Sequence, residues 1–174
     1  MPLARLSYVV WEPEFVTITR SGGGQILREP ALAVVGSDGR LIAVGREAPE
    51  IAHTSGNKLL AFPSVAIAWE HRSAAGRFLY FLWKVVVFAG LPTWEEWIIH
   101  FLPWLRPTVV VHLRGGAEDG LTPERAEWLR SLFPYTGTRR TFVWTGEGLE
   151  PDRYLADTPG RGTWHGPAPR LGTA

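Results

Sequence analysis

Few residues of this chain have the type and spacing that chemistry requires. The 174 residues include no cysteine, which excludes disulfides, thiolate zinc sites and cysteine nucleophiles. The five histidines include no pair at metal-ligand spacing with a helical Glu between them. No Gly-x-Ser-x-Gly sequence marks a serine nucleophile. We therefore expect no catalytic residue, no metal ion and no cofactor.

Two local patterns look functional, but their context favours structural roles. The glycine run at 21–24 could cradle a phosphate, yet it joins two predicted strands, opens no helix and lacks a following Lys-Ser/Thr pair. Glu95 and Glu96 are adjacent, so on a helix their side chains point about 100° apart. Together with Thr93 they fit a helix-capping box better than an acid–base pair.

The segment 78–107 is the most distinctive part of the sequence. Only Lys84 is charged within residues 78–91, and a helix of that length would be about 21 Å long, short of the ~30 Å hydrocarbon core of a bilayer. A second helix is predicted from Thr93, and Pro103 ends or kinks it. Its apolar side chains fall at helical spacing: Trp94, Trp97, Ile98, Phe101 and Leu105.

This apolar stripe must be covered, and tryptophan is enriched at the centres of protein interfaces. The candidate partner-binding residues are Trp94, Trp97, Phe101 and Trp104, the first and last facing a protein partner or a second copy. Two alternatives stay open: the segment fills the domain's own core, or it contacts a membrane surface. The membrane contact is less favoured, because Glu95 and Glu96 are acidic and few cations lie nearby.

The elements that would position these residues follow from hydrophobic patterning. Short β-branched or aromatic runs, separated by turn residues, predict five strands within the first 45 residues as antiparallel hairpins: 7–11, 15–20, 25–27, 31–35 and 41–44. Residues 64–68 are a strand or the start of a helix. Beyond them we predict helices at 47–53, 78–91, 93–105 and 122–132, and strands at 108–113 and 141–144. Trp69 and Phe81 are predicted to lie in the core.

Length and charge indicate one ordinary globular domain. The net charge is +1 and evenly spread, so no basic stripe for nucleic acid is present. We expect a single α/β domain at 1–150 and an irregular, Pro- and Gly-rich tail at 151–174. No signal peptide is evident at the start, which favours a cytoplasmic protein. The preference for Arg over Lys fits a GC-rich and thermophilic source.

Several stretches, in order, resemble bacterial actin homologues of the MreB rod-shape type. Residues 26–35 and 39–48 are similar to that family's "VLNEPSVVAI...GKVLAVGEEA", and residues 54–57 to "TPGN". Residues 67–70 resemble "IADFE", residues 78–85 "MLRYFIRKV", and residues 105–111 "RPRVVICVPSG". The resemblance spans residues 5–147. It implies the first actin-type domain only, a ribonuclease-H-like mixed sheet with opening antiparallel hairpins and crossover helices.

The departures from the family bear on its chemistry. The family's Asp-Leu-Gly-Thr phosphate loop aligns with residues 9–14, where Pro13 removes a backbone donor, Trp11 is expected to fill the approach, and Glu12 and Glu14 would repel phosphates. The family's water-activating carboxylate aligns with Thr145-Gly146, one place before Glu147. The resemblance thus implies an actin-like domain without ATPase activity.

The hypothesis from sequence is a non-catalytic actin-like scaffold or binding module, a pseudo-ATPase. By resemblance it would serve bacterial cell-shape, division or pilus machinery through a protein partner or a homo-oligomer, without nucleic acid. One alternative is a nucleotide-binding hydrolase of the actin-like ATPase type, using Glu147 or Asp38. Another is a peripheral membrane protein that docks through the Trp-rich segment.

Overall fold

The computed structural model describes residues 6–20, 27–88, 108–133, 140–146 and 162–167. The predicted helix at 93–105, the four candidate partner-binding aromatics and Glu147 lie outside the described residues. What is described is a mixed α/β fold built on two sheets, one of six strands and one of three.

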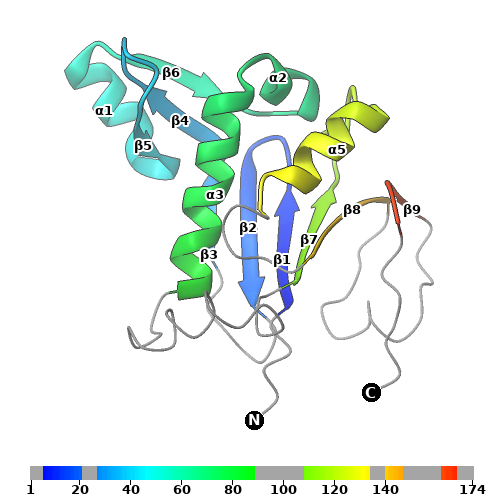
Figure 1. Ribbon diagram of the computed structural model, residues 1–174. Helices are drawn as coiled ribbons and strands as arrows, with labels where there is room; N and C mark the ends of the chain where they lie inside the picture. The colour runs from blue at the N-terminus through cyan, green and yellow to red at the C-terminus, as the bar shows by residue number, and fades with distance from the viewer. Residues whose placement is uncertain (1–5, 21–26, 89–107, 134–139, 147–161, 168–174) are drawn as a thin grey trace.

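The larger sheet has the order β3-β2-β1-β7-β8-β9 (Figure 1). Its strands are β1 (Leu6–Trp11), β2 (Phe15–Arg20), β3 (Leu27–Pro30), β7 (Thr108–Leu113), β8 (Arg140–Gly146) and β9 (Gly162–Trp164). Strands β1, β2 and β3 form an antiparallel meander, whereas β1, β7 and β8 run parallel. This arrangement confirms the mixed sheet with opening hairpins that the sequence predicted.

The smaller sheet has the order β5-β4-β6 and is antiparallel. It consists of β4 (Leu32–Val35), β5 (Leu41–Val44) and β6 (Lys58–Ala61), and β6 was not expected from the sequence. Between β5 and β6 lie a short 3-10 helix, η1 (Gly45–Glu47), and α1 (Ala48–Ser55). The β4–β5 hairpin turns at Gly39, whose positive φ of 75° suits glycine.

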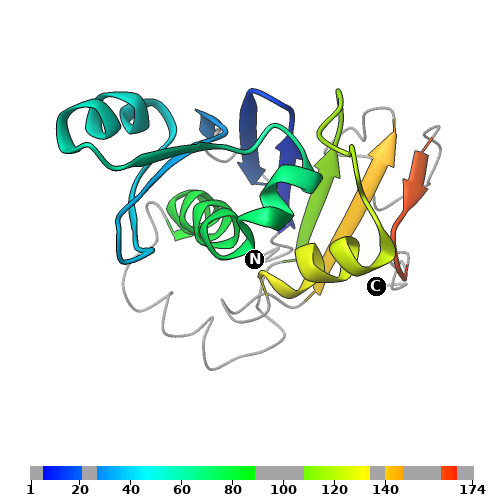
Figure 2. The same cartoon turned by 90° about the horizontal axis from the view of Figure 1, so that it is seen from above.

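Three helices pack on one face of the larger sheet, α2 (Val65–Glu70), α3 (Arg72–Phe88) and α5 (Pro123–Ser131). Figure 2 shows α3 in green and α5 in yellow on the same side of the strands. The α5 helix begins as its sequence indicates: Thr122 is the N-cap, its hydroxyl accepts a hydrogen bond from the Arg125 backbone N–H, and Pro123 follows.

Central strands of the larger sheet are buried on both faces, as expected for parallel strands. Val9, Trp11 and Val111 face α3 and α5 in the main core, together with Phe78 and Phe133. A second cluster lies on the opposite face and contains Tyr8, Val110, Phe142 and Trp144, with Trp164 of β9 against it.

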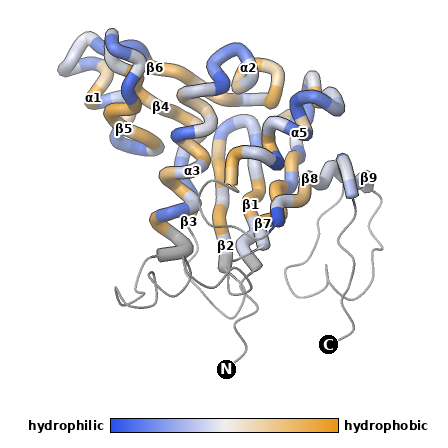
Figure 3. The backbone as a smooth tube through the Cα atoms, in the orientation of Figure 1, coloured by the Kyte–Doolittle hydropathy of each residue, from blue (hydrophilic) through white to orange (hydrophobic). Residues whose placement is uncertain are grey.

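Two core predictions on the helices need correction. Phe81 is 48% exposed, not buried. Most residues of helix α3 are apolar, as its largely orange tube shows (Figure 3). The stripe it buries is Ala75, Phe78, Leu79, Leu82 and Trp83. Trp69 is only half-buried, because it lies between helices, edge-on to Trp128 with ring centroids 5.7 Å apart.

The region 151–174, expected to be an irregular tail, contains β9, which pairs antiparallel with the edge of β8. The strand is held by aromatic contact, since the Trp164 ring lies 4.8 Å from the Trp144 ring and 6.0 Å from that of Phe142. Its pairing is extended by the His165 backbone N–H, which donates to the Val143 carbonyl.

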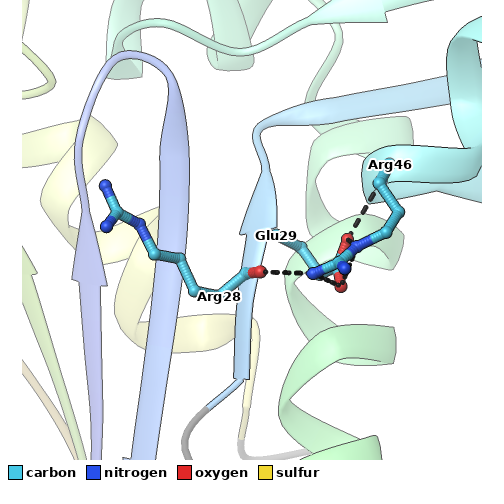
Figure 4. Close-up of polar contacts among 3 residues, drawn as sticks. All are labelled: Arg28, Glu29 and Arg46. Atoms are coloured by element: carbon cyan, nitrogen blue, oxygen red, sulfur yellow. Dashed lines mark hydrogen bonds and ion pairs between the residues drawn. The ribbon is translucent and has the colours of Figure 1, made fainter.

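A polar cluster joins the two sheets where β3 meets η1 (Figure 4). The Arg46 backbone N–H donates to Glu29 Oε2 at 3.0 Å, its Nε to Oε1 at 3.1 Å, and its Nη2 to the Arg28 carbonyl at 3.3 Å. The preceding residue, Gly45, has φ of 67° and a Cβ there would collide with the Glu29 carboxylate. Glycine is therefore required for this close approach.

Candidate functional site

The carboxyl ends of the parallel strands β1, β7 and β8 meet at one edge of the larger sheet. Trp11 is in register with Leu113, and Leu113 with Thr145. In open α/β sheets, ligands bind outside such carboxyl ends. The candidate site therefore comprises the turn 12–14 after β1, the loop 114–120 after β7, and Gly146 at the end of β8.

An ion pair spans this edge. Arg114 donates to Glu12 Oε1 through Nε at 2.9 Å and through Nη2 at 2.7 Å. The Arg114 backbone N–H also donates to the Trp11 carbonyl at 3.1 Å. The turn and the loop are thus tied together, and their opposite charges are satisfied by each other.

The loop after β7 has the glycine content of an anion-binding loop. Gly115, Gly116 and Gly120 all have positive φ, which can turn successive backbone N–H groups toward an anion. In this structure the Gly116 N–H donates to Glu118 Oε2 at 3.1 Å, so the chain's own carboxylate takes that donor. Pro13 also lies close, because a Cβ added at Gly115 would be 3.6 Å from Pro13 Cδ.

Trp11 does not fill the approach to this edge, contrary to the expectation from sequence. Its side chain is fully buried in the main core, and its indole N–H donates to the Phe62 carbonyl at 2.9 Å. Side chains alternate across a strand, so Trp11 shares the inward face with Val9. The groups that lie at the edge are Glu12, Pro13 and Arg114.

Beneath the edge, on the opposite face of the sheet, lies a buried histidine. His112 Nε2 is 2.9 Å from the Gly146 carbonyl, and Nδ1 is 2.5 Å from the Tyr8 hydroxyl. A carbonyl only accepts, so Nε2 carries the proton and neutral Nδ1 accepts from Tyr8. Burial is the largest effect and lowers the pKa of His112 below its ordinary value. The imidazole thus serves as a neutral link between β1, β7 and the end of β8.

The other residues named from the sequence are placed as follows. Asp38 lies in the β4–β5 turn of the smaller sheet, where its carboxylate accepts from the Arg40 backbone N–H at 2.9 Å. It therefore does not adjoin the carboxyl ends of β1, β7 and β8. Within the described residues, no group of three or more His, Asp or Glu is arranged to hold a metal ion.

Sequence reasoning missed the Glu12–Arg114 and Tyr8–His112 pairs. A signal for the first was present, since each residue directly follows a predicted strand and carries opposite charge. To predict the ion pair from this signal, one would have to know that the two strands are adjacent and parallel. For Tyr8 and His112 the sequence holds no comparable signal, because both lie within apolar strands.

The strand order, the parallel centre and the attached three-stranded sheet define an actin-like fold. The chain is similar to MreB5 of Spiroplasma citri bound to ADP (TM-score 0.53, 16% identity, 80% of this chain and 37% of that one) and bound to AMPPNP (0.54, 16%, 80% and 38%). It is also similar to a non-polymerising MamK mutant bound to AMPPNP (0.53, 15%, 80% and 40%).

The chain thus spans about two-fifths of the length of these structures. No protein-family model matches the chain, and no curated protein matches it by sequence. Among the described residues, no helix is both long and apolar enough to cross a membrane.

Proposed function

We propose that this chain is a non-catalytic actin-like module that acts through protein–protein contacts, including contacts between its own copies. The setting that fits the fold is the cell-shape, division or pilus machinery of a bacterial cytoplasm. In this proposal the chain has kept the actin-like scaffold and lost the nucleotide chemistry.

The observation that carries the proposal is that the chain's own side chains occupy the edge formed by β1, β7 and β8. A phosphate-binding loop needs free backbone N–H groups and room for close approach. Here Glu12 is paired with Arg114, the Gly116 N–H is taken by Glu118, and Pro13 lies against the glycine loop. A triphosphate would have to displace two carboxylates, which repel it.

Hydrolysis and assembly assays on the same preparation test this proposal. We expect no phosphate release above the buffer control when the full chain is incubated with Mg-ATP. We also expect sedimentation velocity to give the same concentration-dependent mass with and without Mg-ATP. Turnover that scales with protein concentration, or assembly that requires nucleotide, would contradict the proposal.

A further inference from the structure

An apolar groove lies between α3 and the smaller sheet, away from the edge described above. Its volume is about 420 Å³. One wall is formed by α3, and the other by β5, η1 and α1. The apolar side chains that line it include Leu41, Ile42, Val44, Ile51, Phe81 and Val85.

Exposed apolar surface gathers at this groove. Among the described residues, the large apolar side chains that are exposed are Ile42, Leu59, Ile67, Phe81 and Val85. Three of them, Ile42, Phe81 and Val85, line the groove. Contiguous exposed apolar patches commonly mark interaction sites, whereas single exposed apolar residues are normal. The groove is therefore distinguished from the isolated positions Leu59 and Ile67.

The two walls carry opposite charge. Helix α3 contains no acidic residue, and its exposed Arg77 and Lys84 flank Phe81. On the other wall Glu47 and Glu50 are exposed, while the cation there, Arg46, is paired with Glu29. A partner that fits this surface must present an acidic wall to α3 and a basic wall to α1.

We propose that the groove is occupied by a second copy of this chain, related by a two-fold axis. A two-fold interface requires one patch that is complementary to itself. This patch has both parts of such a contact: a half-exposed Phe81 that lines an apolar hollow, and a basic wall opposite an acidic one. Phe81 of each copy enters the hollow of the other, and Lys84 faces the acidic wall of the other copy.

This inference rests on the proposed self-association of the module and names its surface. The central contact is Phe81, an aromatic side chain in a hollow with charged residues at the rim, as in the centres of known interfaces. The rim charges set orientation and specificity more than affinity.

The test compares two matched substitutions by sedimentation velocity across a range of protein concentrations. Phe81→Glu and Leu59→Glu each place a charge at an exposed apolar position, 48% and 42% exposed respectively, but only Phe81 lines the groove. We expect Phe81→Glu to weaken the dimer about 30-fold or more, the hot-spot scale, and Leu59→Glu to leave it unchanged. Circular dichroism confirms that both variants fold.

A charge exchange tests the two-fold geometry. Lys84→Glu and Glu47→Lys should each weaken self-association, because each homodimer then pairs like charges at both of its symmetry-related 84–47 contacts. Mixing the two variants should restore a heterodimer, because both contacts then join opposite charges. Equal weakening by Phe81→Glu and Leu59→Glu would overturn the inference, as would no weakening by either.

A wild-type chain that stays monomeric at every concentration also overturns the inference, whether another protein or nothing occupies the groove. The Mg-ATP assays on the same samples report separately on the loss of nucleotide chemistry. Failure of the proposed groove dimer and failure of the proposed non-catalytic function therefore give different results.

Discussion

Glu12 and Arg114 are 102 positions apart in the sequence, yet their side chains meet with Nη2 and Oε1 2.7 Å apart. Glu12 follows β1 and Arg114 follows β7, so the pair closes the edge at which a parallel sheet offers its binding loops.

Removing this ion pair should cost little stability. The side chains are 26% and 49% exposed, and exposed pairs typically contribute about 0–1 kcal/mol. We expect Glu12→Gln and Arg114→Met each to lower the free energy of unfolding by less than about 1 kcal/mol. Urea titrations of the single and double variants measure this, and a coupling energy above about 2 kcal/mol would indicate a pair far less screened than its exposure implies.

Phe78 and Phe81 are the same residue type on the same helix, α3, but the first is buried and the second is exposed. Phe78 is fully buried, so Phe78→Ala should lower the free energy of unfolding by about 3–5 kcal/mol. Phe81 is 48% exposed, so Phe81→Ala should cost less than about 1 kcal/mol. Denaturant titration at low protein concentration, where self-association is absent, compares them. Equal losses would mean that Phe81 lies in the core after all.

Helix α3 also shows how far the sequence can be read. The helix was predicted from its apolar run, but its few polar residues constrain its rotation only loosely. Only the packing of Phe78, Leu79 and Trp83 against the strands selects the buried stripe and leaves Phe81 in the groove. Four of the five opening strands were predicted correctly, because turn residues bound them. The third was predicted at 25–27, but β3 (Leu27–Pro30) shares only Leu27 with that range.

The elements that were missed depend on tertiary contacts. Strand β9 is three residues long, and it forms because Trp164 packs on Trp144 and its backbone extends β8. The Glu12–Arg114 pair likewise depends on the adjacency of β1 and β7. A family resemblance supplied the fold class, but no local pattern supplied these contacts.

Stability should depend on pH through His112. Burial lowers its pKa in the folded state, so the folded chain binds fewer protons than the unfolded chain as the pH falls. Above about pH 6.5, the pKa of histidine in an unfolded chain, His112 is neutral in both states and the free energy of unfolding is not reduced. It falls progressively as the pH drops from there toward the lowered pKa of His112 in the folded chain. The free energy of unfolding should therefore decrease from pH 7.5 to lower pH, about where histidine titrates.

A substitution of His112 tests whether this histidine causes the pH dependence of stability. His112→Asn should flatten part of that decrease, leaving the part due to His165, whose pKa burial also lowers. Tyr8→Phe removes the hydroxyl at Nδ1 but keeps the buried imidazole, so it should retain the pH dependence of the wild type. Urea titrations at several pH values give the slopes. The same slope in His112→Asn and wild type would exclude this role.

Gly162 should be essential to β9. A Cβ at this position would collide with the Trp144 ring and the Thr145 carbonyl oxygen. We expect Gly162→Ala to displace β9 and to lower the free energy of unfolding by about 1–3 kcal/mol, the usual cost of overpacking. Near-UV circular dichroism should show loss of the Trp144–Trp164 contact. Thr163→Ala, at the neighbouring exposed position, is the control and should retain the wild-type spectrum.

The most direct test of the central claim is the thermal unfolding of the full chain with and without Mg-ATP. A ligand at 100 times its dissociation constant stabilises a folded protein by about 2.7 kcal/mol, which for a chain of this size raises Tm by about 5–10 °C. With the edge between Glu12 and Arg114 closed, we predict the same Tm at millimolar Mg-ATP as in buffer with magnesium alone. A rise of several degrees that saturates with ATP and is absent with magnesium alone would contradict the account.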